Sequence, residues 1–220
     1  MEEAKKNPLV KLDEITYSAA ISACEKGGEW KKAVELFEEA KKNPQVKCDV
    51  ITYSATIQAC ASGQQPHLAM QLFEEAERLK LVDLITYNAI LDAVNQEHST
   101  ARALYLKAIK NRLYGKTEGR EDEMPKLDLH DHSEGAAETA VRWWLDERVS
   151  NMKEQKSQRL LIVTGWGKTR EDWRTSDIKK RVENVLKEMS LSTFPSENAG
   201  RVLVDWPGST PPHEPSENCK

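Results

Sequence analysis

The chain has 220 residues, with charged side chains at 31% of positions and a formal net charge of −4 at pH 7. This length suits one large domain or two small ones, and the composition is that of a globular protein. No apolar run approaches the roughly 20 residues that a membrane-spanning helix needs, so no membrane partner is expected. Nucleic-acid-binding proteins are typically basic, so any RNA-binding surface in this acidic chain must be local.

The four cysteines, Cys24, Cys48, Cys60 and Cys219, form no CxxC pair. Structural zinc sites usually contain such pairs, so no metal site is expected from them. Cys24 and Cys60 lie among apolar residues, where a reduced thiol in the core is the ordinary state. The cysteines therefore predict a reducing compartment.

An internal repeat occupies the first half of the chain. Asp13–Ala19 recurs as Asp49–Ala55 and again as Asp83–Ala89, at offsets of 36 and 34 residues. A second block agrees, because Leu36–Ala40 matches Leu72–Ala76. Three copies of one unit are therefore present.

Each copy contains two helical patterns. In the first copy, the apolar residues that predict the first helix are Ile15, Ala19, Ile21, Ala23 and Cys24. Gly27 and Gly28 end this helix, and Asn43-Pro44 end the second. Helix pairs of this length cannot bury their apolar faces alone, so we expect an α-helical solenoid. Its units begin at residues 14, 50 and 84, after a partial unit over residues 1–13.

The helical pattern stops after Asn111. Residues 114–125 are polar, charged and interrupted by Gly and Pro, which predicts a linker. The pattern then predicts a strand at 126–130, a helix at 136–152, a strand at 159–164, a helix at 178–189 and a strand at 201–206. This β-α-β-α-β order predicts a small, parallel-rich sheet with helices packed on it. The segment 207–220 is rich in Pro, Ser and Glu, and we expect it to be disordered.

The opening Thr-Tyr-Ser or Thr-Tyr-Asn of each copy, with an Asp before it, resembles the pentatricopeptide repeat (PPR) over residues 1–113. The period is also close to that of tetratricopeptide repeats, but their W-x2-L-G-x2-Y opening is absent. The resemblance implies binding of single-stranded RNA, with about one base read per repeat. A helical solenoid used for protein contacts is the alternative.

The resemblance also implies which side chains read bases. They are the residue after Thr-Tyr and the last residue of the unit, which gives Ser18 with Asp49, and Ser54 with Asp83. Both pairs resemble those that favour guanine, because a carboxylate can accept hydrogen bonds from the N–H edge of that base. Asn88 opens the third unit, where a pyrimidine would be typical, and its partner is unclear. Asp49 and Asp83 have an alternative role as helix N-caps.

Two motifs end predicted strands of the second region. Asp128-Leu129-His130 ends the first, and Thr164-Gly165-Trp166-Gly167-Lys168 ends the second. The carboxyl ends of parallel strands meet at one edge of a sheet, so both motifs should converge there. Cations and indoles that can bind phosphates and stack on bases form a local basic patch. Its members are Trp166, Lys168, Arg170, Trp173, Arg174, Lys179, Lys180 and Arg181, of which Trp166 and Arg170 are the predicted RNA contacts.

The order of these motifs, followed by Asn198-x-Gly200-x-Val202, resembles the small MutS-related (Smr) domain over residues 126–206. Behind PPR units, it resembles the PPR–SMR proteins of plants and algae. The resemblance implies an α-helical solenoid followed by a small α/β domain, and RNA processing in a chloroplast or mitochondrion. Other RNA-processing proteins are then expected partners, and some Smr domains are endonucleases.

For a domain that cleaves RNA, the resemblance and the chemistry assign roles. His130 acts as general base or acid, and Asp128 orients it or holds a divalent ion such as Mg²⁺. The backbone at Gly165 and Gly167, with Lys168, holds the scissile phosphate. The alternative is that Asp128 and His130 only tie the strand end to the next loop.

The sequence departs from the Smr pattern in two places. The residue after His130 is usually glycine but is Asp131 here, and Thr169-Arg170 stands where His-Ser-Arg is frequent. A carboxylate beside His130 repels phosphate. The leading hypothesis is therefore RNA binding coupled to RNA processing, with endonuclease activity undecided. A non-catalytic RNA-binding adaptor and a protein-interaction scaffold are the alternatives.

Overall fold

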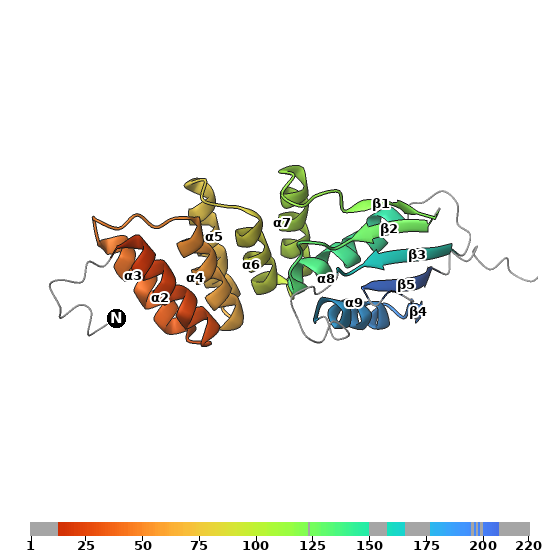
Figure 1. Ribbon diagram of the computed structural model, residues 1–220, viewed down its shortest axis with the longest axis horizontal. Helices are drawn as coiled ribbons and strands as arrows, with labels where there is room; N and C mark the ends of the chain where they lie inside the picture. Colours follow the sequence, from red (N-terminus) through yellow and green to blue (C-terminus); the bar gives the residue numbers. More distant parts are fainter. Residues whose placement is uncertain are drawn as a thin grey trace, which may run out of the picture. The chain divides into compact units, whose positions relative to one another are not determined.

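Six consecutive helices make up the N-terminal part of the described chain (Figure 1). The computed structural model describes residues 13–122, 124–149, 158–165, 177–194, 196, 198 and 200–206. The helices are α2 (Glu14–Lys26), α3 (Trp30–Lys42), α4 (Val50–Ser62), α5 (Pro66–Arg78), α6 (Leu84–Val94) and α7 (His98–Lys110). They form three pairs, and the first helix of each pair begins at the predicted start of a repeat.

The chain divides into two compact units. The first, called the repeat region here, consists of the described residues up to Gly115 together with His132–Thr139. The second, the sheet region, consists of Lys116–Asp131 and the described residues from Ala140 onward.

An aspartate starts the first helix of every repeat. The Oδ1 atoms of Asp13, Asp49 and Asp83 each accept a hydrogen bond of 2.9 Å from the backbone N–H three residues later. That third residue is a threonine in every copy, and its hydroxyl donates to the same carboxylate oxygen. Such caps satisfy N–H groups that the first helical turn leaves without partners. The repeated Asp-x-x-Thr therefore fixes where each repeat begins.

Aromatic side chains join neighbouring repeats. Tyr53 of α4 meets Phe37 of the preceding repeat edge to face, with ring centroids 5.0 Å apart. Tyr87 of α6 meets Phe73 in the same way and at the same distance. Such pairs add stabilisation beyond the apolar area that they bury. The hydroxyl of Tyr53 donates to Glu75 at 2.9 Å, so the buried ring leaves no polar atom without a partner.

The predicted apolar stripe of the first helix is wrong in part. Tyr17 and Ile21 are buried in α2, whereas Ala19 and Ala23 are exposed, and Ile15 is 73% exposed. At 100° per residue, positions 17 and 21 share one face, and position 15 lies on the opposite one. Counting apolar residues does not distinguish these two faces.

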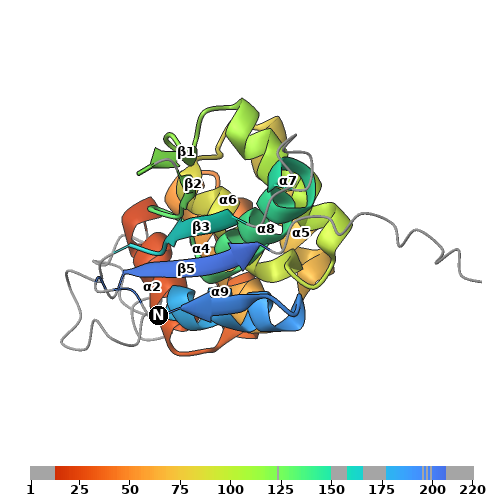
Figure 2. The same ribbon diagram turned by 90° about the vertical axis from the view of Figure 1, so that its right-hand side faces the viewer.

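Five strands form the sheet (Figure 2). They are β1 (Glu118–Glu121), β2 (Met124–Asp128), β3 (Gln158–Val163), β4 (Ser192–Phe194) and β5 (Arg201–Trp206), arranged in the order β1-β2-β3-β5-β4. The helices are α8 (Glu134–Trp143), which continues as a π-helix over Trp144–Val149, and α9 (Asp177–Glu188). Helix α9 packs against β4 and β5 through its buried residues Val182, Val185 and Leu186.

The prediction of a parallel-rich sheet is wrong. Only β2 and β3 are parallel among the described strands, with Asp128 opposite Val163. β5 runs antiparallel to β3, and both β1 and β4 pair antiparallel with their neighbours. The reason is the short strand β4, which follows α9 and lets the chain turn back into β5. Its three residues are exposed and carry no apolar pattern, so no strand was predicted there.

The segment 114–125 is not the predicted linker. Tyr114 is buried, and β1 pairs with β2 with Glu118 opposite Leu127. Asp122 adopts a positive φ of 48° at the turn between these strands. An edge strand made of charged residues pairs through its backbone, so its side chains show no strand pattern. Residues 1–12 of the predicted partial unit over 1–13, and the predicted disordered tail over 207–220, lie outside the described residues.

Two predictions about the whole chain concern thiols and membranes. Cys60 is buried, Cys24 is half-buried, and both are free thiols. Burial raises the pKa of the Cys60 thiol to about 11, so it stays protonated at neutral pH. No helix in the described residues has the length and apolar character to cross a bilayer.

The two faces of α4 should respond differently to truncation. Ile57 is fully buried and Ile51 is 58% exposed. We expect Ile57→Ala to lower the free energy of unfolding by about 2–5 kcal/mol, because it removes buried methyl groups and leaves a cavity. Ile51→Ala, the matched control, should change it by no more than about 0.5 kcal/mol. Urea unfolding followed by helical circular dichroism measures both, and equal losses would contradict this account of the helix faces.

Candidate nucleic-acid interface

The first predicted base-reading pair is brought together by the fold. The hydroxyl of Ser18 lies 2.9 Å from the hydroxyl of Thr52, in the next repeat. Thr52 in turn donates to Asp49 Oδ1 at 2.7 Å. Since the Thr52 proton goes to Asp49, Ser18 is the donor to Thr52. Ser18 is half-buried, and the carbonyl oxygen of Glu14, 2.8 Å from its hydroxyl, is the competing acceptor for the same proton. Ser18 and Asp49 thus belong to one hydrogen-bonded chain that spans two repeats.

The second predicted pair has a more enclosed serine. Ser54 is only 6% exposed, and its hydroxyl donates to the carbonyl oxygen of Val50 in its own helix. A hydroxyl in this state can still accept a hydrogen bond, but its proton is committed. Asp83, its predicted partner, is half-buried at the start of α6.

The predicted reading aspartates use one oxygen for capping. Asp49 and Asp83 both accept the cap hydrogen bonds on Oδ1. Their other oxygen, Oδ2, accepts no hydrogen bond from any described residue. Capping, one of the two roles that the sequence left open, therefore leaves Oδ2 available for the predicted base contact.

The structure shows a row of exposed isoleucines that was not predicted from the sequence. Ile15, Ile51 and Ile85 are 73%, 58% and 66% exposed, and each lies two residues after a capping aspartate. Each also lies three residues before the predicted reading residue, which makes the two side chains neighbours on the helix surface. The signal was present in the repeat itself, because large apolar residues recur at a position that the buried face does not need.

Asn88, the reading residue of the third repeat, has different surroundings. The hydroxyl of Tyr114 donates to Asn88 Oδ1 at 2.7 Å. The backbone N–H of Ser133 donates to the same atom at 3.3 Å. Its predicted counterparts, Ser18 and Ser54, have no such contacts with residues 114 or 133.

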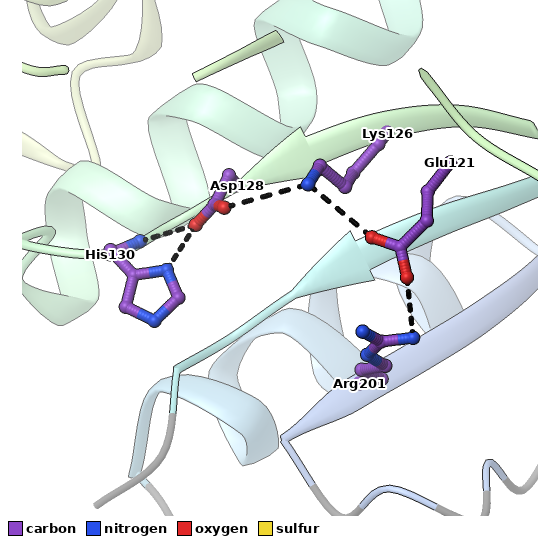
Figure 3. A network of polar contacts seen from close by, with 5 residues as sticks. All are labelled: Glu121, Lys126, Asp128, His130 and Arg201. Atoms are coloured by element: carbon purple, nitrogen blue, oxygen red, sulfur yellow. Dashed lines mark hydrogen bonds and ion pairs between the residues drawn. The ribbon is translucent and has the colours of Figure 1, made fainter. Parts of the chain in front are cut away.

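In the sheet region, the structure brings Asp128, His130 and Gly165 together, and Figure 3 shows the first two. Asp128 ends β2, and its Oδ1 accepts a hydrogen bond of 3.1 Å from the backbone N–H of His130. The same oxygen contacts Nδ1 of the His130 ring. The opposite side of the ring faces Gly165, where an added Cβ would lie 3.8 Å from Nε2. The parallel pairing of β2 with β3 produces this convergence.

Charged residues that the sequence did not single out extend this cluster (Figure 3). Lys126 Nζ lies 4.0 Å from Asp128 Oδ2 and 3.4 Å from Glu121 Oε2. Arg201 Nη1 lies 2.7 Å from Glu121 Oε1. Lys126 shares a strand face with Asp128 because side chains alternate along β2. The Asp128 carboxylate therefore lies between His130 and a cation.

The motif Asn198-x-Gly200-x-Val202 supports the end of β3. The side chain of Asn198 accepts a hydrogen bond from the N–H of Gly200 at 3.0 Å, and the carbonyl of Gly200 accepts one from the N–H of Thr164 at 2.9 Å. Val202 is buried in β5. This turn fixes the residue that precedes Gly165.

Several residues predicted to belong to the basic patch or to the phosphate-holding corner lie outside the described residues. They are Trp166, Gly167, Lys168, Arg170, Trp173 and Arg174. Lys179, Lys180 and Arg181 are on α9, where Lys179 lies 4.0 Å from Glu183. Within the described residues, no three His, Cys, Asp or Glu side chains gather as a metal site. A divalent ion held by Asp128 would take most of its ligands from water and phosphate, as Mg²⁺ commonly does.

Comparisons with known proteins bear on the repeat region. Residues 12–62 match a model described as PPR repeat family, and residues 42–97 match the pentatricopeptide repeat domain. A solved structure of the pentatricopeptide repeat protein PPR10 from maize is similar, with 14% identity and a TM-score of 0.49. The similarity covers 86% of this chain and 22% of PPR10. A search of curated proteins finds no match. Residues 12–97 are therefore similar to pentatricopeptide repeats.

Gly165 should be sensitive to substitution because of its backbone. It has a φ of +81°, which residues with a Cβ rarely adopt. We expect Gly165→Ala to lower the free energy of unfolding by about 1–2 kcal/mol. Gly115→Ala is the control, since no atom lies within 4 Å of its added Cβ and its φ is not positive. Denaturant unfolding measures both, and two equally stable variants would show that this corner tolerates a side chain.

Proposed function

We propose that this chain binds single-stranded RNA through its pentatricopeptide repeats and acts in RNA processing. The observation that carries the proposal is the exposed isoleucine that stands next to a reading residue in every repeat. Such an apolar side chain serves no purpose in the core of the solenoid. It suits the face of an unpaired base, which packs on apolar and aromatic surfaces.

The polar groups beside these isoleucines suit the edge of the base. Asp49 Oδ2 is the acceptor that can meet the N–H groups of guanine, while Oδ1 holds the helix start. Ser18 is tied to the same carboxylate through Thr52, so the pair acts from a fixed geometry. Ser54 is more buried, so its contribution comes as an acceptor and the second pair discriminates mainly through Asp83.

RNA binding should depend on the isoleucine row. In fluorescence anisotropy at low ionic strength, we expect labelled RNA with a GG step to bind more tightly than one with AA in its place. Ile51→Ala should weaken binding about three- to tenfold, the order of a lost base contact. Leu79→Ala, another exposed apolar truncation, should not, because Leu79 lies at the end of α5 and outside the row.

The substitution Asp49→Asn separates the capping role of this side chain from its proposed reading role. Asp49→Asn keeps a side-chain oxygen for the cap but removes the charge that favours guanine. It should reduce the preference for GG while leaving the fold intact. Wild-type protein that is folded but indifferent to all single-stranded RNA would overturn the proposed function.

The sheet region is proposed to be an Smr domain over residues 126–206. Its support is the corner formed by Asp128, His130 and Gly165. The Asp128 carboxylate at Nδ1 orients the imidazole, so that Nε2 faces the glycine corner. There Nε2 can take a proton from, or give one to, a group attached to phosphorus. Gly167 and Lys168 are proposed to hold the phosphate from the adjoining segment.

One observation favours the non-catalytic adaptor as second candidate. Asp131 adopts a φ of +66°, the conformation for which glycine is preferred at this position of the Smr pattern. The backbone requirement is met, but a carboxylate stands beside His130 and repels phosphate. By resemblance to the PPR–SMR proteins, we place either activity in a chloroplast or mitochondrion, with other RNA-processing proteins as partners.

Cleavage can be tested separately from binding. If the sheet region is an endonuclease, His130→Ala should slow cleavage of a GG-containing RNA about 10²-fold or more without changing its binding. His67→Ala, at an exposed position of α5, should cleave like the wild type. Asp131→Gly should speed cleavage because it removes the repulsion. Equal cleavage by wild type and His130→Ala, or none by any variant, would leave the adaptor as the function.

A further inference from the structure

The third repeat differs from the others at its reading position. Asn88 Oδ1 accepts the hydroxyl of Tyr114 at 2.7 Å and the backbone N–H of Ser133 at 3.3 Å. The hydroxyl of Ser133 donates to the backbone carbonyl of Asn88 at 3.3 Å. Because a backbone N–H can only donate, the atom facing Ser133 must be the amide oxygen. An amide oxygen has two lone pairs, so its acceptor capacity is filled.

The residues that close this position are themselves held firmly. The Tyr114 ring stacks on His132, with centroids 4.1 Å apart and planes inclined by 21°. Nε2 of His132 lies 3.0 Å from the Tyr105 hydroxyl. Tyr114 is 3% exposed and His132 is 5% exposed. Burial also raises the pKa of the Tyr114 hydroxyl, so it remains a proton donor to Asn88.

The segment that contains Ser133 is also anchored to α6 one helical turn after Asn88. The N–H of Gly135 donates to Asp92 Oδ1 at 2.7 Å. An added Cβ at Gly135 would lie 2.5 Å from the carbonyl oxygen of Leu91, which is closer than atoms tolerate. The backbone at Gly135 therefore packs closely against α6. Moving Tyr114 and Ser133 away from Asn88 would break several of these contacts at once.

We infer that the third repeat does not read a base, because Tyr114 and Ser133 of the same chain occupy the reading position at Asn88. Base-specific recognition by the repeats described here then ends with the pair Ser54 and Asp83. The inference rests on the proposed function. Ile85 remains 66% exposed, so the third repeat still offers a surface for a base of any identity.

The closure itself can be tested without RNA. Asn88→Ala removes the partner of a buried hydroxyl, and we expect it to lower the Tm by about 2–8 °C. Ser18→Ala, at the equivalent position of the first repeat, should change the Tm little. Tyr114→Phe should also lower the Tm, and the double variant should lose no more than the larger single loss, because both remove one interaction. Asn88→Ala with a wild-type Tm, or additive losses in the double variant, would overturn the inference.

RNA binding then tests the consequence. Eight RNAs carry a GG step with each of the four bases on its 5′ side or its 3′ side. We expect the dissociation constant of the wild type to vary less than twofold across this set. Asn88→Ala should show the same pattern, whereas Ile85→Ala should weaken all eight equally. A preference of fivefold or more for one flanking base, lost in Asn88→Ala, would overturn the inference while leaving RNA binding in place.

Failure of the proposed function has a different outcome. In that case none of the eight RNAs binds, although the Tm losses of Asn88→Ala and Tyr114→Phe persist. The closure at Asn88 would then stand as a structural contact, and its meaning as the end of base reading would be lost.

Discussion

The contact on which the repeat region depends is the one between an aspartate and the threonine three residues after it. It fixes the first residue of each repeat, and with it the rotation of the helix that follows. Tyr17, Tyr53 and Tyr87 then turn inward, where two of them meet a phenylalanine of the preceding repeat. The residue two places before each tyrosine turns outward. A start shifted by one residue would rotate these positions by 100° and turn the tyrosine away from the buried face.

The sequence was sufficient to predict those features of the fold that depend on residues close together in the chain. Helix starts and ends depend on Asp-x-x-Thr, Gly27-Gly28 and Asn43-Pro44, and α2 and α3 end where these signals lie. The buried face of α2 depends on neighbouring helices, and there Ile15 was misassigned. Strands β1 and β4 were missed for a different reason. Each is a short edge strand that pairs through its backbone with the next strand along the chain, so its own side chains carry no pattern.

The candidate site in the sheet region shows the same division. The sequence predicted two neighbouring parallel strands, whose carboxyl ends bring Asp128, His130 and Gly165 together. β2 and β3 have that arrangement. The contacts from Lys126 to Glu121 and on to Arg201 could not be predicted, because they require β1 and β5 to be placed first. The closure of Asn88 is also non-local, since Ser133 lies 45 positions further along the chain.

For an acidic chain, the proposed reading of RNA with aspartates raises an electrostatic problem, and the caps lessen it. Asp49 and Asp83 stand at helix N-termini, where the helix dipole places about half a positive charge. Each carboxylate also accepts two hydrogen bonds on one oxygen. The potential that an approaching phosphate would meet is therefore weaker than the formal charge implies, while Oδ2 keeps its acceptor capacity for the proposed base contact. The interaction that starts each helix thus makes the same side chain tolerable to a polyanion.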